Sequence, residues 1–548
     1  MTTQRSLSGF IIAGAIALVV VAIAGYNWFF AKSPVNLAAT SQSSAAVFVS
    51  KLAPVTVSLL VNPDRLASFD SSGELSKLKN SLLAKSGLDY KQDIQPWLKD
   101  EITLAVTTLD IDRDPENGKQ PGYLMALATD KPPKSQEFLQ LLFSKRVLAG
   151  ANLATEEYQG AKLIYDSSLP ESDSLAGAVV DNFVLFANNP KVLRDAINNV
   201  QAPDLNLLSS PEYQKATQQL PKGSIATAFL NLPLVAQWQG LNLPEPTYDS
   251  ESVALTLNSQ GIFAETNFLT DLEVEPTSPS LSKPVGALQY IPASAGLVIS
   301  GSHLDNLGKG GLGKLWTQAK TAISGSGTDI IARLVQPLTD VESKQGINLE
   351  QDIFSWVQGE YAVALVPREG KTSPEWVFVT EKLETVPEGI ARLDAIASSG
   401  GLSSNTITLD KQKVAAWTEL TTAKTDSTNK PSFTVEAKVK GVHTTLGNYE
   451  IFTSDLATMY EVVSNKEKSV ISDRNFQDSI AAIPQPNQGY IYVDWTKSQN
   501  LVEQQIPILK LIEVVGKPLF ENLRSLTFSS YGDEAGTLKG GVFLQLTR

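Results

Sequence analysis

The sequence predicts an α+β protein with two homologous halves, each a mostly antiparallel sheet with packed helices, after one N-terminal transmembrane helix. Three observations support this prediction: an apolar run near the N-terminus, an internal repeat, and alternating β-rich and helical segments. The chain has 548 residues, of which 42% are hydrophobic and 19% are charged. This composition excludes a disordered chain, a collagen and a polytopic membrane protein.

The N-terminal segment is the predicted membrane anchor. Residues 1–9 form a short tail, and residues 10–30 are almost continuously apolar, which matches the roughly 20 residues needed to span a bilayer. A cleaved signal peptide is the alternative, because residues 22–24 form an A-x-A site. We favour the anchor because the apolar run continues past that site, and we expect the small, polar residues 31–45 to be a flexible tether.

An internal repeat divides the rest of the chain. Residues 87–106 align without a gap with residues 346–365, and seven of the 20 aligned positions are identical, where chance would give about one. The Pro- and Ser-rich residues 271–284 then indicate a linker. It separates a first half, residues 46–270, from a second half, residues 285–548.

Further aligned segments and local patterns predict the elements of each half. Residues 181–189 align with residues 447–455, and residues 209–221 align with a segment that ends at Pro484. Apolar and polar residues alternate over 433–440, which indicates a half-exposed antiparallel strand. Helices are expected at 134–148, 190–199, 211–220, 314–323, 385–397, 454–464 and 497–515.

The repeated element Q-D-I-x-x-W-x-x-x-E has a structural interpretation. Asp89 and Asn348 are suitable N-caps for a short helix that leads into a strand. A functional alternative is that the two acids of each copy form a paired acidic site. We favour the structural interpretation, because residues repeated in both halves are more often determinants of the fold. The repeated acidic and aromatic residues are Asp93, Trp97, Glu101, Asp352, Trp356 and Glu360.

The anchor, the two copies and this repeated element resemble a family of cyanobacterial membrane-anchored proteins that is catalogued as a domain of unknown function. The resemblance covers nearly all of the chain beyond the tether. It implies a thylakoid or plasma-membrane location and a duplicated architecture. It brings no catalytic residues.

The composition also limits the chemistry. The chain has no cysteine and only two histidines, His303 and His443, which excludes thiolate metal sites, thiol nucleophiles and a three-histidine zinc site within one chain. Both histidines are expected at the surface or in loops. We expect no cofactor and no nucleotide, because residues 308–315 lack the Ser or Thr that a phosphate loop needs after its lysine. A net charge of −13 without a basic block argues against a nucleic-acid partner.

One loop, at residues 109–122, is a candidate metal site. Its alternating acids are Asp110, Asp112, Asp114 and Glu116. Their carboxylates could supply oxygen ligands to calcium, although Pro115 at the position of the invariant glycine rules out an EF-hand. A solvated acidic turn is the alternative, which we favour because the matching turn of the second half is not acidic.

The sequence therefore predicts a single-pass membrane protein whose body lies in the periplasm or thylakoid lumen. Because no catalytic motif stands out, we expect a non-enzymatic binding or scaffold role with a protein partner in the membrane or envelope. Two alternatives stay open: an envelope-polymer hydrolase that uses a carboxylate pair, and a lipid or pigment carrier. A hydrolase requires a cleft with two convergent acids of perturbed pKa, and a carrier requires an enclosed apolar cavity.

Overall fold

The computed structural model describes most of the chain. The described residues are 43–62, 89–114, 116, 118–167, 174–239, 248–258, 260–270, 280–304, 349–371, 373–425, 432–464, 468–499, 522–534 and 537–547. The predicted tail, the anchor and most of the tether lie outside these ranges, as do residues 271–279 of the linker and residues 308–315. Within the described ranges, no helix is long and apolar enough to cross a membrane.

Ten strands of the described chain make up what we call the first strand set. They are β1 (Val55–Leu59), β2 (Leu98–Thr108), β3 (Gly122–Thr129), β4 (Leu153–Tyr158), β5 (Ala161–Asp166), β6 (Ala176–Val180), β7 (Phe183–Ala187), β8 (Ala226–Asn231), β9 (Ser250–Leu257) and β10 (Gly261–Leu269). Their order across the sheet is β4-β5-β6-β7-β3-β2-β1-β8-β9-β10, and every pair is antiparallel.

Ten further described strands make up the second strand set. They are β11 (Leu297–Ser302), β12 (Glu360–Val366), β13 (Glu375–Glu381), β14 (Ser403–Leu409), β15 (Gln412–Thr425), β16 (Ser432–Leu446), β17 (Tyr449–Thr453), β18 (Tyr490–Asp494), β19 (Leu523–Glu534) and β20 (Thr537–Leu546). Their order is β14-β15-β16-β17-β13-β12-β11-β18-β19-β20, again antiparallel throughout. Counted from the first strand of each set, the two orders are the same.

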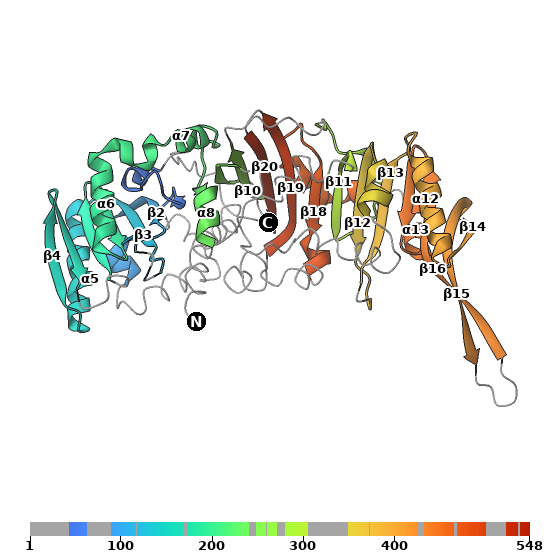
Figure 1. Cartoon of the computed structure of the whole chain (residues 1–548), viewed down its shortest axis with the longest axis horizontal. Helices are drawn as coiled ribbons and strands as arrows, with labels where there is room; N and C mark the ends of the chain where they lie inside the picture. The colour runs from blue at the N-terminus through green and yellow to red at the C-terminus, as the bar shows by residue number, and fades with distance from the viewer. Residues whose placement is uncertain are drawn as a thin grey trace.

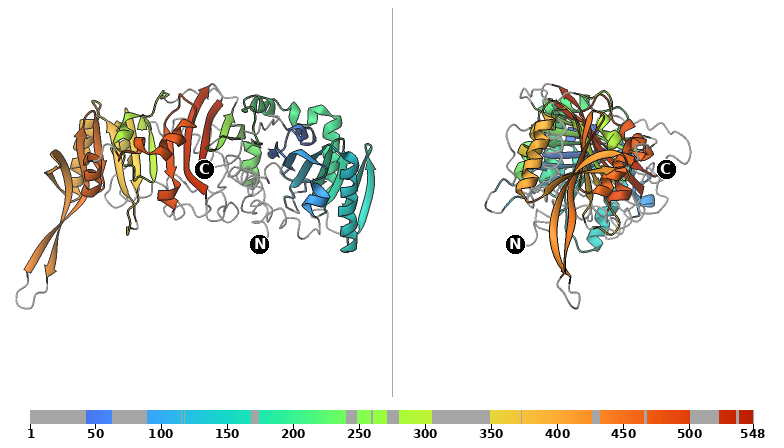
Figure 2. Two further views of the ribbon diagram at one scale, coloured as in Figure 1. Left: turned by 180° about the vertical axis from the view of Figure 1, so that it is seen from behind. Right: turned by 90° about the vertical axis from the view of Figure 1, so that its right-hand side faces the viewer.

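The two strand sets are joined into one sheet by their last strands. β10 and β20 pair antiparallel, with Glu265 opposite Gly541 at the centre of the ladder. The molecule is therefore elongated, with β4 near one end and β14 to β16 at the other (Figure 1). A view along the long axis shows the hairpin of β15 and β16 projecting beyond the body (Figure 2).

Helices of the described chain cover parts of the sheet. They are α5 (Pro132–Leu148), α6 (Pro190–Gln201), α7 (Pro211–Gln218), α8 (Leu232–Gln239), α12 (Val386–Ser399), α13 (Leu456–Ser464) and α14 (Arg474–Ala481). Short helical turns are η1 (Ser44–Phe48), η2 (Tyr90–Ile94), η4 (Pro203–Leu205), η5 (Leu207–Ser209), η6 (Gly286–Tyr290), η8 (Leu349–Ile353), η9 (Phe354–Trp356) and η11 (Val470–Ser472).

Most of the predicted local structure is confirmed where the chain is described. The helices expected at 134–148, 190–199, 211–220, 385–397 and 454–464 are α5, α6, α7, α12 and α13, and the alternating residues 433–440 lie in β16. The helix expected at 314–323 and most of the one expected at 497–515 lie outside the described residues. The mostly antiparallel sheet with packed helices is thus confirmed.

Corresponding helices begin with the same kind of cap. The Ser210 hydroxyl accepts the backbone N–H of Tyr213 at the start of α7, and the Asp473 carboxylate accepts that of Phe476 at the start of α14. Each capped aromatic residue is buried and packs edge-on against the sheet: Tyr213 lies 5.2 Å from Phe229, and Phe476 lies 5.0 Å from Tyr492. The aligned segments therefore make the same capping and aromatic contacts in both strand sets.

The prediction for the histidines is wrong for His443. His443 lies in β16 and is 9% exposed, with its ring 5.2 Å from that of Trp417 and 5.4 Å from that of Phe452. Its Nδ1 lies 3.0 Å from a carboxylate oxygen of the buried Glu450. The Glu450 carboxylate thus meets Nδ1 and aromatic rings cover the imidazole, while Nε2 is buried without a hydrogen-bond partner among the described residues. His303 does lie in a loop, just after β11.

Candidate functional site

The repeated tryptophans hold the same position in both strand sets. The indole Nε1 of Trp97 donates a 2.7 Å hydrogen bond to the carbonyl of Asp93, and that of Trp356 donates a 2.6 Å bond to the carbonyl of Asp352. Both rings are buried, and each closes a short helical turn against the sheet. In the first copy, Asp89 caps this turn by accepting the N–H of Gln92 at 2.8 Å.

The repeated glutamates reach a different helical turn. Glu101 is buried and accepts hydrogen bonds from the hydroxyl of Ser43 at 2.5 Å and the backbone N–H of Ala45 at 2.9 Å, at the start of η1. Glu360 accepts the backbone N–H of Gly286 at 2.6 Å, at the start of η6. Neither turn has a capping side chain of its own. Each carboxylate is therefore a long-range cap, which supports the structural interpretation of the repeat.

Tyr449 fixes the second of these carboxylates. Its hydroxyl donates a 2.8 Å hydrogen bond to Glu360, and burial together with that bond raises the pKa of Tyr449, which keeps the hydroxyl a donor. Gly286 is required here, because a Cβ would lie 2.3 Å from the Tyr449 hydroxyl.

The two acids of the first copy of the repeat contact different groups. The Asp93 carboxylate accepts the backbone N–H of Asp89 at 2.8 Å and lies 3.9 Å from the Lys145 ammonium. Glu101 contacts neither of these groups among the described residues.

A cleft of about 930 Å³ lies in the first strand set, and we call it the α6 cleft. It is bounded by α6, α8, the segment after η1 and the loop between β2 and β3. Its apolar lining includes the buried Phe48, Ile111 and Val192, while Leu52 and Leu205 at its edge are 67% and 48% exposed. A volume of this size is within the ~300–1,000 Å³ range of ligand pockets.

Charged side chains surround this apolar lining. The cations are Lys51, Arg113, Lys119 and Lys191, and the acids are Asp110 and Asp195. Cations thus outnumber acids in the cleft, whereas the whole chain has a net charge of −13. The excess of positive charge is therefore a local property of this site.

Two lysines fix the loop that forms one wall of the α6 cleft. The Nζ of Lys191 on α6 donates to the carbonyl of Ile111 at 2.6 Å, and the Nζ of Lys119 in the loop donates to the carbonyl of Gln237 on α8 at 3.1 Å. Each ammonium keeps further N–H donors for a ligand. By contrast, neither the Lys51 ammonium nor the Arg113 guanidinium has a hydrogen bond or ion pair to another residue in the described part of the chain.

The acids of the same loop cap its turns. Asp112 accepts the backbone N–H of Asp114 at 3.1 Å, and Asp114 accepts that of Glu116 at 2.9 Å. Asp110 accepts the N–H of Gln120 at 3.4 Å and is the one predicted calcium ligand that lines the cleft. Among the described residues, no three His, Cys, Asp or Glu side chains are grouped so that they could hold a metal ion. The calcium hypothesis therefore rests on the sequence alone.

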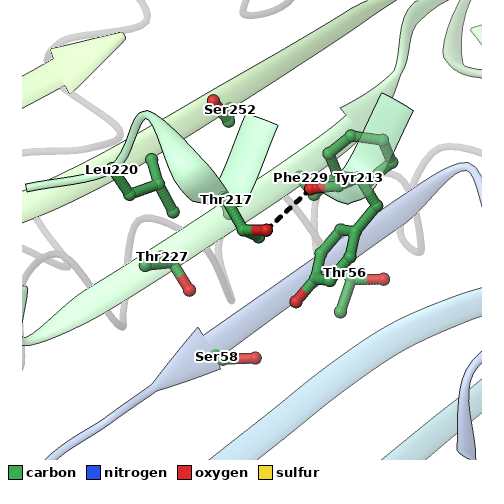
Figure 3. A pocket seen from close by; sticks show the side chains of 9 residues that line it. Thr56, Ser58, Tyr213, Thr217, Leu220, Thr227, Phe229 and Ser252 are labelled. Atoms are coloured by element: carbon green, nitrogen blue, oxygen red, sulfur yellow. Dashed lines mark hydrogen bonds between the residues drawn. The ribbon is translucent and has the colours of Figure 1, made fainter. Parts of the chain in front are cut away.

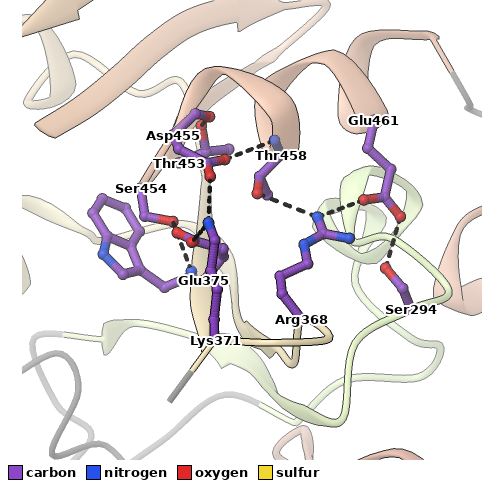
Figure 4. A network of polar contacts seen from close by, with 10 residues as sticks. Ser294, Arg368, Lys371, Glu375, Thr453, Ser454, Asp455, Thr458 and Glu461 are labelled. Carbon is purple, nitrogen blue, oxygen red and sulfur yellow. Dashed lines mark hydrogen bonds and ion pairs between the residues drawn. The ribbon is translucent and has the colours of Figure 1, made fainter. Parts of the chain in front are cut away.

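In the second strand set, the loop that corresponds to the wall of the α6 cleft has its cations paired with acids. The loop between β12 and β13 carries Arg368, whose guanidinium donates to Glu461 at 2.6 Å and to Thr458 at 3.2 Å (Figure 4). Ser294 donates to the other oxygen of Glu461 at 2.7 Å. Lys371 of the same loop pairs with Glu375, and with Asp455 at 3.3 Å. The cations of this loop are thus neutralised by α13 and β13.

The alignment of residues 181–189 with 447–455 shows which acids of the two strand sets correspond. When this alignment is continued without a gap, Asp195 on α6 corresponds to Glu461 on α13. Burial raises the pKa of Asp195, and the charges of Lys191 and Arg113 act in the opposite direction. Arg113 is close enough to influence Asp195 but forms no ion pair with it among the described contacts, whereas Arg368 and Glu461 do pair.

A second, smaller pocket lies under α7. Its volume of about 10 Å³ is on the order of a single water molecule. Tyr213 and Thr217 of α7 and Leu220 just after it cover the pocket, and hydroxyls of the sheet face it (Figure 3). The hydroxyls of Thr56 and Ser252 are buried without a hydrogen-bond partner among the described residues. The pocket is too small for an organic ligand.

The sequence patterns did not reveal the cations of the α6 cleft. The four acids of the loop stand out in the sequence, but Arg113 and Lys119 of the same loop line the cleft together with Asp110. A comparison of the two matching loops carries the relevant signal. Both loops contain an arginine and a lysine, and among the described residues only those of the second loop form ion pairs with acids.

Together, these features define an α+β protein with one open antiparallel sheet and a cationic, partly apolar cleft. The chain belongs to DUF3352, a family of proteins of unknown function, whose model matches residues 11–546. This confirms the resemblance to a family catalogued as a domain of unknown function. No curated protein matches the chain.

Solved structures give weak similarities. Crystal form I of TP0453 has 9% sequence identity and a TM-score of 0.26, over 43% of this chain and 82% of that one. Crystal form III has 12% identity and a TM-score of 0.25, over 43% of this chain and 84% of that one. Scores this low carry no argument about fold or function.

Proposed function

We propose that this protein is a membrane-anchored binding or scaffold protein without catalytic activity, and that the α6 cleft is its binding site. The observation that carries the proposal is the contrast between matching loops. Arg368 and Lys371 are ion-paired in the loop of the second strand set, while Arg113 in the matching loop has no ion pair in the described chain, and neither has Lys51, which lines the same cleft from the segment after η1. Unpaired cations beside exposed leucines suit a partner that supplies negative charge and apolar surface.

We further propose that the two strand sets are copies of one ancestral unit. Seven identities in the repeated element, the shared strand order and the matching Glu101 and Glu360 caps support this duplication. In such a protein one copy can keep an architectural role while the other acquires a ligand. The second strand set, whose loop cations are paired with acids beside α13, fits the architectural role, and the first strand set, with its α6 cleft, fits the ligand-binding role.

The location is proposed from the N-terminal sequence. The family model begins at residue 11, so the apolar run at residues 10–30 belongs to the part of the chain that the family shares. A single span there would place the body in the periplasm or thylakoid lumen, close to partners in the membrane or envelope.

The alternatives have less support. A hydrolase needs two acids that point toward one substrate bond. The α6 cleft contains Asp110 and Asp195, and the Asp110 carboxylate already accepts the backbone N–H of Gln120. A lipid or pigment carrier needs an enclosed apolar cavity, whereas the α6 cleft is open and edged with charged side chains. A binding role requires neither feature.

Cross-linking tests the proposed function. The tagged full-length chain is cross-linked mildly in native membranes, purified in detergent, and the co-purifying proteins are identified by mass spectrometry. Reproducible recovery of one membrane or envelope complex is expected. Recovery of the chain alone, with or without cross-linker, would overturn the scaffold proposal.

A further inference from the structure

The α6 cleft combines two kinds of contact that a ligand must match. Leu52 and Leu205 are exposed at its edge, and the backbone N–H of Lys51 bonded to the Leu205 carbonyl at 2.9 Å holds their two segments together. Buried apolar side chains, including Phe48 and Val192, form the lining behind them. A ligand that buries these leucines gains hydrophobic stabilisation.

The charged side chains of the cleft determine which charge a ligand must carry. The ammonium groups of Lys119 and Lys191 are held by backbone carbonyls and need no reorganisation to meet an anion. Arg113 can form two parallel hydrogen bonds to one carboxylate. Because the rest of the chain is acidic, an anionic ligand is repelled elsewhere and attracted here.

The openness of the cleft bears on the class of ligand. Its cations and Leu52 are exposed, so an acyl chain lying there would remain largely in water. An extended peptide can alternate its side chains between an apolar wall and a charged edge. From the cleft, its apolar lining and its unpaired cations, we infer that the α6 cleft binds an acidic peptide segment with interspersed apolar residues, supplied by a partner protein.

This inference rests on the proposed function and names the chemistry of the partner at that site. The test measures fluorescence anisotropy of a short synthetic peptide that alternates glutamate and leucine and carries an uncharged dye. The protein is the full chain in uncharged detergent. A peptide with glutamine in place of glutamate is the charge control.

Charge reversal at the cleft is the decisive comparison. Lys51→Glu with Arg113→Glu is expected to weaken binding at least about tenfold, and added salt should weaken binding to the wild-type chain. Lys215→Glu with Lys222→Glu, at two exposed lysines outside the cleft, is the matched double-reversal control and should change affinity less than about twofold. Neither charged group has a hydrogen bond or ion pair among the described residues, and the substitutions leave the backbone bond of Lys51 in place, so circular dichroism should show unchanged folding.

Four outcomes would overturn the inference. It fails if the glutamine peptide binds as tightly as the glutamate peptide, or if charge reversal has no effect. It also fails if vesicles containing phosphatidylglycerol bind through Lys51 and Arg113 while the peptide neither binds nor competes, because the ligand is then a lipid surface. Capture of a partner in native membranes without peptide binding would sink this inference alone. Peptide binding without any captured partner would instead count against the proposed scaffold role.

Discussion

The Glu101 carboxylate accepts a 2.9 Å hydrogen bond from the backbone N–H of Ala45, which lies 56 residues earlier in the chain. The carboxylate thereby caps η1 and fixes it against β2. Because η1 also packs on α6, this contact helps to position one wall of the α6 cleft. Glu360 makes the matching contact with Gly286, at 2.6 Å.

We predict that Glu101→Gln destabilises the protein. An amide has only one acceptor oxygen and would direct an N–H₂ donor at the backbone N–H groups, so the loss should be roughly 1–3 kcal/mol of unfolding free energy. Urea unfolding of the detergent-purified chain measures it. Glu360→Gln is the matched variant and should show a loss of similar size. A midpoint equal to that of wild type for both variants would contradict the capping role.

The small pocket under α7 leads to a paired prediction. Ser479 on α14 bonds to Thr527 at 2.6 Å and to Ser525 at 3.0 Å. By the alignment, the residue in place of Ser479 on α7 is Ala216, and Ser252 on β9 stands opposite Phe229 as Thr527 stands opposite Tyr492. The absence of a hydroxyl at Ala216 explains why the Ser252 hydroxyl is unsatisfied.

Ser479→Ala should therefore lower the unfolding free energy by about 1–2 kcal/mol, because it leaves buried hydroxyls without a partner. Ala216→Ser should raise it by a few tenths to about 1 kcal/mol, by supplying a partner where one is missing. Both are measured by urea unfolding. Opposite signs support the correspondence of α7 and α14, and destabilisation by both variants would contradict it.

Gly389 of α12 packs directly against the ring of Trp356. A Cβ there would lie 2.4 Å from Trp356 Cδ2, so Gly389→Ala should cost about 1–3 kcal/mol through overpacking, despite the better helix propensity of alanine. Thermal unfolding followed by tryptophan fluorescence would show the loss. Ser135 lies at the matching position of α5, and Ser135→Ala is the control, with an expected change below about 1 kcal/mol. Equal Tm values for Gly389→Ala and wild type would exclude the tight contact.

Glu251 predicts a pH dependence of stability. It is 5% exposed, one carboxylate oxygen accepts a hydrogen bond from Thr266 at 3.0 Å, and the other has no hydrogen-bond partner in the described part of the chain. Burial raises the pKa of Glu251 from 4.5 to about 7. The folded protein therefore binds this proton more tightly than the unfolded chain does. The resulting stabilisation is fully present below pH 4.5 and is lost as the pH rises through about 7.

Glu251→Gln removes that titration and keeps a side chain of similar size. Compared with wild type, the variant should gain up to ~3 kcal/mol in relative stability between pH 4.5 and pH 8. Urea midpoints of both proteins across this range give the comparison. Parallel curves would show that folding does not change the pKa of Glu251, which would contradict the prediction.

The sequence predicts much of the local structure because periodicity and capping are local. Asn189, Ser210 and Asp473 cap helices that the alignment places correctly. The repeat also identified Trp97 and Glu101 as structural residues. It did not identify the partner of Glu101, because a contact spanning 56 residues leaves no periodic signal.

The α6 cleft could not be predicted for the same reason. Its cations lie on segments far apart in the chain, such as Lys51 and Lys191, and only the pairing of β1, β2 and β3 with the placement of α6 brings these together. The burial of His443 was missed because its partner Glu450 lies on the neighbouring strand β17. Residue types alone indicate neither whether a charge is paired nor whether a ring is covered.

Site-specific photo-cross-linking in native membranes tests the central claim, that the α6 cleft is the binding site. A photoreactive amino acid replaces Gln237, an exposed and uncharged residue that lines the α6 cleft, in one variant and Lys371, in the loop between β12 and β13, in the other. The account predicts that the variant at position 237 captures one reproducible partner and that the variant at position 371 captures none. Capture at both positions, or only at position 371, would contradict it.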